Sequence, residues 1–160
     1  MFKLTKSQKG FTLIEILVVI GIIAILATIV IIAINPARQF AQARDTQRVS
    51  NTNAILNAIG QRLADNAGVF EGTFTASDAT TATCGPLPST TATTITWTMA
   101  TDITTETGAL GCLVPTYIPQ ALNDPSPGTL GDYSVISPAA GRVTVAAPAA
   151  EINIPISITR

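Results

Sequence analysis

Very few side chains in this sequence could carry out chemistry. The 160 residues include no histidine, and the lysines Lys3, Lys6 and Lys9 all precede Gly10. Without a histidine or a later lysine, the body of the chain cannot build a Ser-His-Asp triad, a Ser-Lys pair, a Schiff base or a histidine-ligated metal site. Only carboxylate pairs or a thiol are left as catalysts, and the sequence offers no carboxylate pairing to propose. We therefore expect a protein without enzyme activity and without a cofactor.

The charge balance argues against nucleic-acid binding. Past Gly10 the chain has six arginines against ten acidic residues, which gives a net charge of −4. Affinity for nucleic acid comes largely from Lys and Arg neutralising phosphates, so a basic binding face is not expected. Only 12% of the residues are charged, about half the share usual in globular proteins. This composition predicts one modest domain, with part of the chain outside water.

One carboxylate, Glu15, lies within the longest apolar segment. Residues 11–34 form an almost unbroken apolar run of 24 residues, which as a helix would reach about 36 Å and cross a hydrocarbon core of about 30 Å. An ionised carboxylate placed centrally in such a segment costs about 2.5–3.5 kcal/mol, so it needs a compensating group. A cut between Gly10 and Phe11 would create an α-amine four residues before Glu15. That amine could pair with Glu15 of its own chain or of a neighbour.

The basic segment before the run predicts its orientation. Three lysines and no acid in residues 1–10 keep this end in the cytoplasm, so residues after Ile34 are expected outside. A secretory signal would have a shorter apolar stretch, and the small-x-small tripeptide at residues 41–43 lies well past the run. A lipoprotein signal needs a cysteine just after the run, whereas the first is Cys84. A plain single-span anchor is the remaining alternative, but it does not explain Glu15.

The segment Gly10-Phe11-Thr12-Leu13-Ile14-Glu15 follows a basic leader and opens a long apolar helix. In this it resembles the type III signal of type IV pilins and pseudopilins. The resemblance implies that a membrane prepilin peptidase cuts after Gly10 and that the new N-terminal residue, Phe11, is methylated. It also implies that Glu15 pairs with the N-terminus of an adjacent subunit during assembly.

The resemblance implies that the protein is a subunit of a homo-oligomeric filament. Before assembly it would be a single-pass protein of the bacterial inner membrane, in contact with lipid and with its C-terminus outside. Inner-membrane assembly machinery would then build it into a filament at the cell surface or in the periplasm. A type IV pilus and a pseudopilus of type II secretion share the signal, so both stay open. A membrane-anchored extracellular binding domain that never polymerises is the rival from another class.

A second resemblance concerns a loop and its acids. Residues 117–119, 123–125 and 131–133 are similar to a loop of the major pseudopilins of type II secretion, in which a neighbouring loop can hold calcium. Asp124 and Asp132 are therefore candidate metal ligands. Two acids fall short of the roughly six to eight oxygens that Ca²⁺ takes, and turn formation is the alternative role for these residues.

The dipeptide Asn35-Pro36 interrupts the helical pattern. Pro36 removes a backbone donor and crowds the preceding turn, so we expect a kink or a locally melted stretch there. In the resembling family such flexibility helps helices pack in a filament, although a kink without a role fits equally well. A helix continuation over residues 35–66 is expected, and it ends near residues 65–68, where Asn and Gly are normal helix stops. Its apolar stripe comprises Val49, Ile55, Leu56, Ile59 and Leu63, and the charged residues around it, interpreted as a solvated face, are Arg38, Arg44, Asp45, Arg48 and Arg62.

The rest of the chain, residues 67–160, is expected to form a β-rich extracytoplasmic head. Threonine-rich residues 73–107 predict short strands, with glycosylated threonines as the alternative to a plain strand face. Within them, alternation at Ile95, Trp97 and Met99 predicts one half-buried strand.

Alternation also predicts strands near the C-terminus. Residues 132–137 and 142–147 flank a four-residue connection and predict a hairpin. Alternating isoleucines from Ile152 to Ile158 predict a last strand, which Pro155 places at a sheet edge. Packed on the helix stripe, these strands give an α+β fold with a pilin-like long helix and a small antiparallel sheet.

The two cysteines are Cys84 and Cys112. The lysine asymmetry places both outside the cytoplasm, where pairing is the default. In the chain-entropy model, a disulfide closing this loop stabilises the head by about 3.6 kcal/mol. Two buried free thiols are the alternative.

Overall fold

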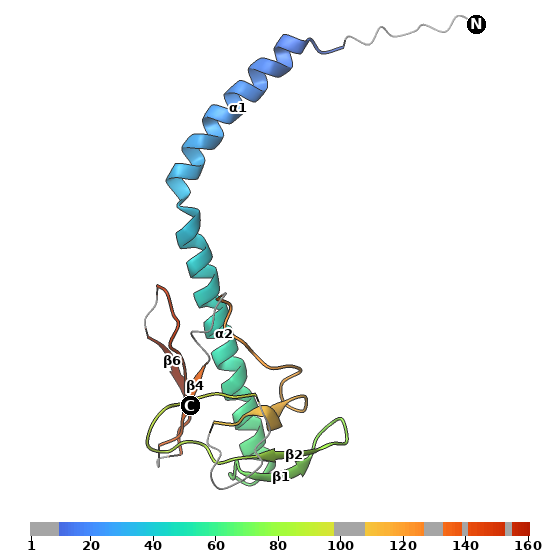
Figure 1. The fold of residues 1–160 in the computed structure, drawn as a ribbon, viewed down its shortest axis with the longest axis vertical. Coiled ribbons are helices and arrows are strands. Elements are labelled where there is room, and N and C mark those ends of the chain that lie inside the picture. Colours follow the sequence, from blue (N-terminus) through green and yellow to red (C-terminus); the bar gives the residue numbers. More distant parts are fainter. Residues whose placement is uncertain (1–9, 98–107, 127–132, 139–140, 153–154) are drawn as a thin grey trace, which may run out of the picture. The chain divides into compact units, whose positions relative to one another are not determined.

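A computed structural model describes residues 10–97, 108–126, 133–138, 141–152 and 155–160. The chain divides into two compact units, Met1–Phe40 and Ala41–Arg160, and the second is called the head below. Two long helices and two small antiparallel sheets confirm the predicted α+β class (Figure 1). The elements are α1 (Leu13–Ile34), α2 (Pro36–Asp65), β1 (Gly72–Thr75), β2 (Thr81–Cys84), β3 (Thr93–Thr94), the 3-10 helix η1 (Gly111–Leu113), β4 (Ser134–Ile136), β5 (Thr144–Ala147) and β6 (Ile156–Thr159).

Helix α1 is apolar on all sides. Its 22 residues include one charged side chain, Glu15, and none of them is buried. Among the described residues, α1 is the one helix long and apolar enough to cross a membrane. An apolar helix with no polar face cannot be a surface helix of a soluble domain, because such helices bury one stripe and expose another.

Helix α2 ends where the sequence predicts. Its last residue is Asp65, and the chain then takes left-handed backbone angles at Ala67 (φ 51°) and Gly68 (φ 88°). The Gly68 N–H donates to the carbonyl of Leu63 at 2.7 Å, which satisfies one of the carbonyls left open at the helix end.

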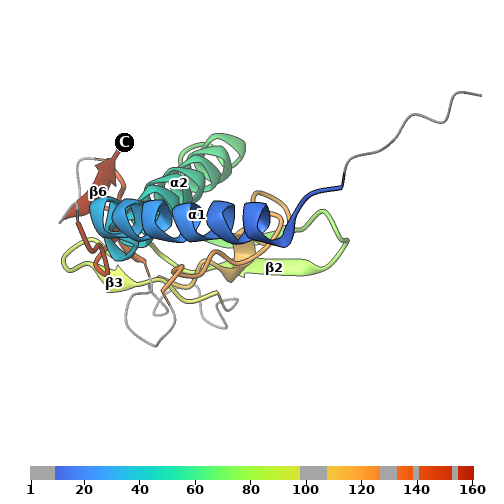
Figure 2. The same ribbon diagram turned by 90° about the horizontal axis from the view of Figure 1, so that it is seen from above.

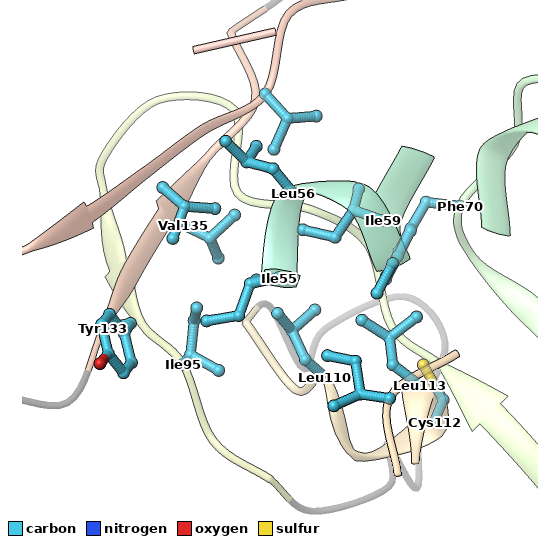
Figure 3. Packing of buried hydrophobic residues seen from close by; sticks show 14 of the residues in the cluster. Ile55, Leu56, Ile59, Phe70, Ile95, Leu110, Cys112, Leu113, Tyr133 and Val135 are labelled. Atoms are coloured by element: carbon cyan, nitrogen blue, oxygen red, sulfur yellow. The ribbon is translucent and has the colours of Figure 1, made fainter. Parts of the chain in front are cut away.

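The core of the head lies between α2 and the strands. Ile55 and Ile59 of α2 are buried against residues that include Val135 of β4 and Leu110 (Figure 3). The predicted apolar stripe is thus confirmed at these positions and at Leu56, whereas Leu63 is only partly buried. The prediction for Val49 is wrong, since its side chain is 40% exposed. The residues that continue the buried face toward the start of the head are Asp45, Arg48 and Thr52.

The four-stranded sheet has the order β3-β4-β5-β6. The predicted hairpin is confirmed as β4 and β5, with Val135 opposite Val145, although residues 139–140 of its connection lie outside the described part. β6 is an edge strand of this sheet, as Pro155 predicts, because it pairs only with β5. Ile156 is buried, whereas Ile152 is 39% exposed.

The threonine-rich segment forms short strands in both sheets. β1 and β2 make a separate two-stranded sheet, which Figure 2 shows apart from β3 and β6. Its threonines lie on one face and Phe74, Ala82 and Cys84 on the other. Of the alternation predicted to form a strand, Ile95 is buried and Trp97 is partly buried just after β3, while Met99 lies outside the described residues.

Candidate processing and assembly site

The bond predicted to be cleaved lies before the first turn of α1. Gly10 is exposed with open space where a Cβ would stand, and the Phe11 side chain is 84% exposed. Thr12 is the N-cap of α1, with extended backbone angles (φ −79°, ψ 151°). The bond between Gly10 and Phe11 is therefore outside the helix, where its backbone groups are not held in a helical hydrogen-bond ladder.

Glu15 closes a capping box with Thr12. The Thr12 N–H and the Thr12 hydroxyl each donate to Glu15 Oε2 at 2.8 Å, and the Glu15 N–H donates to Thr12 Oγ1 at 3.3 Å. Two donors at the start of α1 are satisfied in this way. Every donor to the carboxylate is neutral, so Glu15 has no cationic partner among the described residues.

The two helices meet at Asn35. α1 ends at Ile34, Asn35 has left-handed backbone angles (φ 46°, ψ 79°), and α2 begins at Pro36. The Asn35 carbonyl accepts a hydrogen bond from the Arg38 N–H at 3.2 Å. Asparagine tolerates the left-handed conformation better than most residues, and proline at the first helical position lacks only a donor that would be unsatisfied anyway. The interruption predicted at Pro36 thus takes the form of a helix end at Asn35.

Arg48 is fully buried in the head and surrounded by carboxylates. Its Nε and Nη2 donate to the two oxygens of Asp124 at 2.8 and 2.9 Å, and Nη1 donates to Asp45 at 2.7 Å and to Glu151 at 3.0 Å. Nη2 also donates to the Ser126 hydroxyl. The interpretation of these charges as a solvated face is wrong, because Arg48 is 0% exposed and Asp45 1% exposed. We call Arg44, Asp45, Arg48, Asp124 and Glu151 the Arg48 cluster.

Two further contacts tie the Arg48 cluster to the C-terminal strands. The backbone N–H groups of Glu151 and Ile152 donate to the two oxygens of Asp45 at 2.9 and 2.8 Å. Arg44, at the partly exposed edge of the cluster, donates from Nε to Glu151 at 2.6 Å. The cluster thereby joins α2 to segments more than 70 positions further along the chain.

The pKa values within the cluster follow from these contacts. The hydrogen bonds that Arg48 donates to Asp124, and then those to Asp45 and Glu151, raise the pKa of Arg48 against the opposing effect of burial. Burial would raise the pKa of Asp124, but hydrogen bonds from Arg48 and Ser126 outweigh it and lower the pKa. Hydrogen bonds from Arg44 and Arg48 lower the pKa of Glu151 to about 2. Asp124 and Glu151 are consequently charged at neutral pH.

Arg62 is a second buried arginine that was expected on a solvated face. It is 4% exposed, its Nε donates to the carbonyl of Phe70 at 3.2 Å, and its guanidinium carbon lies 4.3 Å from the centre of the Phe74 ring. The expectation of a solvated Arg62 is therefore wrong, because a backbone carbonyl and an aromatic face hold the cation.

Cys84 and Cys112 form a disulfide, with an S–S distance of 2.06 Å. Both residues are buried, and they join β2 to η1. The alternative of two buried free thiols does not apply to this structure, which has no free cysteine.

The structure argues against Asp124 as a metal ligand. Both of its oxygens accept hydrogen bonds from Arg48, and Oδ1 also accepts the Ser126 N–H at 2.8 Å. A cation at Asp124 would have to displace a buried guanidinium. Asp132, the other candidate, lies outside the described residues.

Thr12 and the Arg48 cluster were not identified from the sequence. Thr12 could have been, because Thr12-x-x-Glu15 at the start of an apolar run is the capping-box pattern. For Arg48 the local signal was weak: an arginine three residues from an aspartate fits an exposed helix face equally well.

The comparisons with known proteins concern the same N-terminal segment. Residues 5–31 match the family model described as the prokaryotic N-terminal methylation motif, and this range includes Gly10, Phe11 and Glu15. No curated protein and no solved structure matches the chain. The N-terminal segment of this protein thus carries the prokaryotic N-terminal methylation motif, the processing signal of type IV prepilins and pseudopilins.

Proposed function

We propose that this protein is a structural subunit of a type IV pilus-like filament. It is made as a precursor, a prepilin peptidase removes residues 1–10, and Phe11 becomes the methylated N-terminus. The observation that carries the proposal is the methylation motif at residues 5–31, which begins in a basic leader and runs into a wholly apolar helix.

Helix α1 would be stable first in a bilayer and then in the filament. Its large apolar side chains are exposed over the whole length from Leu13 to Ile34. Such a helix needs either lipid or protein around it, because leaving its apolar side chains exposed to water costs a free energy of about 25 cal/mol per Å² of apolar surface. The corresponding helices of other copies supply that protein environment in a filament.

Glu15 would guide assembly through the new N-terminus. Within the described residues of the precursor, its carboxylate accepts hydrogen bonds only from Thr12. After cleavage, the Phe11 amine is the nearest new cation along the chain. Pairing with a neighbour's amine would compensate the charge and set the axial register between two subunits.

The outward side of α2 in the head also supports assembly. Charged residues of α2 from Arg44 to Arg62 face the head, and none of the exposed residues between Gln42 and Ala64 is charged. Arg160 brings one charged side chain to this face, where it donates to Asn53 and Asn57. About 25–35% of a typical solvated surface is charged, so this otherwise neutral face suits contact with another protein chain. The residues of this outer face of α2 are Gln42, Ala43, Thr46, Gln47, Val49, Ser50, Asn57, Gly60, Gln61 and Ala64.

The location of the protein in the cell follows from the same processing signal and apolar helix. Before assembly the protein spans the bacterial inner membrane once, with the leader in the cytoplasm and the head outside. The disulfide between Cys84 and Cys112 fits a head on the oxidising side. The role is structural rather than catalytic, and the partners are further copies, prepilin peptidase and the inner-membrane assembly machinery.

A pseudopilus of a type II secretion system is the second candidate. Pseudopilins carry the same processing signal, and residues 117–119 and 123–125 are similar to a loop of the major pseudopilins. The third candidate, a membrane-anchored binding domain, differs from both because it needs neither cleavage nor polymerisation.

Mass spectrometry of the mature N-terminus tests the proposal. We expect a chain that begins at Phe11 and carries one extra methyl group, and we expect Gly10→Leu to leave the full-length precursor in the membrane. Gly21→Leu, which adds the same side chain inside α1 where space is also open, should be cut normally. An intact Met1 in wild-type protein would favour the anchored domain, whereas normal cleavage of Gly10→Leu would show that Gly10 does not define the cleavage site.

A further inference from the structure

The six arginines of the chain fall into two groups. Four have partners in the head: Arg44 and Arg48 bind carboxylates, Arg62 binds a backbone carbonyl, and Arg160 donates to Asn53 and Asn57 of α2. The guanidinium groups of the other two, Arg38 and Arg142, make no hydrogen bond or ion pair within the described part of the chain.

Arg38 differs from Arg142 in its place along the chain. It belongs to the same compact unit as α1 and lies four residues beyond Ile34, the last residue of that helix. The 22 residues of α1 span about 33 Å, slightly more than a hydrocarbon core of about 30 Å. With α1 across a bilayer, the polar residues that follow it are at the level of the lipid headgroups on the outer side.

Among the described residues, Arg38 makes no ion pair, and the acids nearest to it along the chain are already engaged or distant. The next acid along the chain is Asp45, whose oxygens are held by Arg48 and by two backbone N–H groups of the head. The only acid of α1, Glu15, lies near its opposite end. The first group of opposite charge that an exposed guanidinium meets just outside the hydrocarbon core is therefore a phospholipid phosphate.

We propose that Arg38 binds phospholipid phosphates of the outer leaflet and so fixes the depth of α1 in the bilayer before assembly. The proposal rests on the membrane-spanning state described under Proposed function. The planar guanidinium donates two parallel N–H groups to phosphate oxygens, a contact that must break when the subunit leaves the membrane.

Solid-state NMR of the full-length chain in phosphatidylethanolamine and phosphatidylglycerol bilayers tests the contact directly. With arginine labelled at Cζ, phosphorus-31 should dephase part of the guanidinium signal. Arg38→Gln should abolish this dephasing, and Arg142→Gln, which removes the other unpartnered arginine, should leave it unchanged. Equal dephasing in wild type and Arg38→Gln would overturn the proposal, as would its absence from inserted wild-type protein.

Two further arms separate the alternatives. In galactolipid bilayers, which lack phosphate, with inorganic phosphate added, we expect no dephasing, and a signal there would make free phosphate the ligand and overturn the proposal. Amide hydrogen exchange across α1 reports insertion in every sample. A chain whose α1 amides exchange freely would contradict the membrane-spanning state itself, whereas a protected α1 without dephasing would contradict only the role of Arg38.

Discussion

Glu15 in α1 and Asp45 in the head both accept hydrogen bonds from backbone N–H groups, but only Asp45 also forms an ion pair in the described structure. Asp45 accepts two such bonds and also lies 2.7 Å from a guanidinium nitrogen of Arg48. Glu15 accepts from the N–H and the hydroxyl of Thr12, and both donors are neutral. The head therefore neutralises its buried carboxylate internally, whereas the carboxylate of α1 has no cation beside it in the described part of the chain.

The difference matches the two environments. A buried carboxylate in the head stays ionised only with a cation and several hydrogen bonds, and Asp45 has both. Among the described residues, every buried side-chain nitrogen and oxygen has a hydrogen-bond partner. Glu15 is exposed and has room for one more partner, which is what a residue that pairs with another chain requires. The described part of the head thus satisfies its buried polar groups by itself, whereas under the proposed function α1 is completed by assembly.

The largest expected effect comes from removing the carboxylate of α1. We expect Glu15→Ala to leave cleavage and membrane insertion intact, because the apolar run only becomes more compatible with lipid. Filament yield, measured by shearing and electron microscopy, should fall below detection or at least about tenfold, because the neighbour's Phe11 amine would be left among apolar side chains without a counter-charge, at a cost of about 2.5–3.5 kcal/mol per contact.

Glu15→Gln separates charge from helix capping. The amide oxygen can still accept the hydrogen bonds from Thr12, so the start of α1 is preserved. If pairing with an amine is what matters, this variant should lose filaments as Glu15→Ala does. Wild-type filament yield from processed Glu15→Gln protein would show that the charge of Glu15 has no part in assembly.

Replacing Arg48, the buried cation of the head, should lower the stability of the head and leave the contacts between assembled subunits unchanged. Arg48→Met keeps most of the buried volume but leaves Asp45 and Asp124 charged without their main partner. We expect the free energy of unfolding of the head to fall by about 3–5 kcal/mol. Urea titration of the full-length chain in detergent, followed by fluorescence of the single tryptophan, Trp97, measures this change.

Arg142→Met is the matched control for Arg48→Met. Its side chain is exposed and makes no hydrogen bond or ion pair with the described residues, so its removal should change stability by less than about 0.5 kcal/mol. Similar losses from both variants would mean that the Arg48 cluster does not stabilise the head.

The same contrast explains what could be predicted from the sequence. Features that depend on neighbouring residues were predicted correctly: the apolar run of α1, the end of α2 near Gly68, the hairpin of β4 and β5, and the edge position of β6. Each depends on periodicity, a left-handed glycine or a proline within a few residues.

Features that depend on distant residues were missed. Arg48 contacts Asp124 and Glu151, which lie 76 and 103 positions away along the chain. No local sequence pattern predicts such partners. When the distant partners are unknown, the local pattern favours a solvated position for a charged residue on a helix, and the spacing of Val49 fits an apolar stripe. In the structure the buried face is extended by the charged pair and not by Val49.

Removal of the disulfide of the head is expected to have a smaller effect on the free energy of unfolding. Replacing both Cys84 and Cys112 by Ser removes the constraint that this crosslink puts on the unfolded chain. In the chain-entropy model the head should lose about 3.6 kcal/mol. The urea midpoint read from Trp97 should fall, while cleavage and insertion of α1 should not change. Unchanged stability of the double variant would show that the disulfide does not constrain the unfolded chain.

The smallest expected effect is the acid sensitivity of the Arg48 cluster. The folded-state pKa of Glu151 is about 2, below the value of about 4.3 usual for an unfolded glutamate, and that of Asp124 is also lowered. Groups with lowered pKa values stabilise the fold fully above the unfolded pKa, and this stabilisation is lost as the pH falls through the folded pKa. The urea midpoint of the head should therefore be level near neutrality and decline from about pH 5 toward pH 2.

Glu151→Gln sharpens this last test. The variant keeps a hydrogen-bond acceptor near Arg44 and Arg48 but cannot titrate, so its decline between pH 5 and pH 2 should be shallower than that of wild type. Because Glu151 is partly exposed, solvent screens its charge and the difference should be modest. Asp65→Asn, a change at an exposed carboxylate outside the cluster, should reproduce the wild-type slope. Parallel slopes for all three proteins would place the acid sensitivity outside Glu151, and the comparison between α1 and the head would then rest on Asp45 and Asp124 alone.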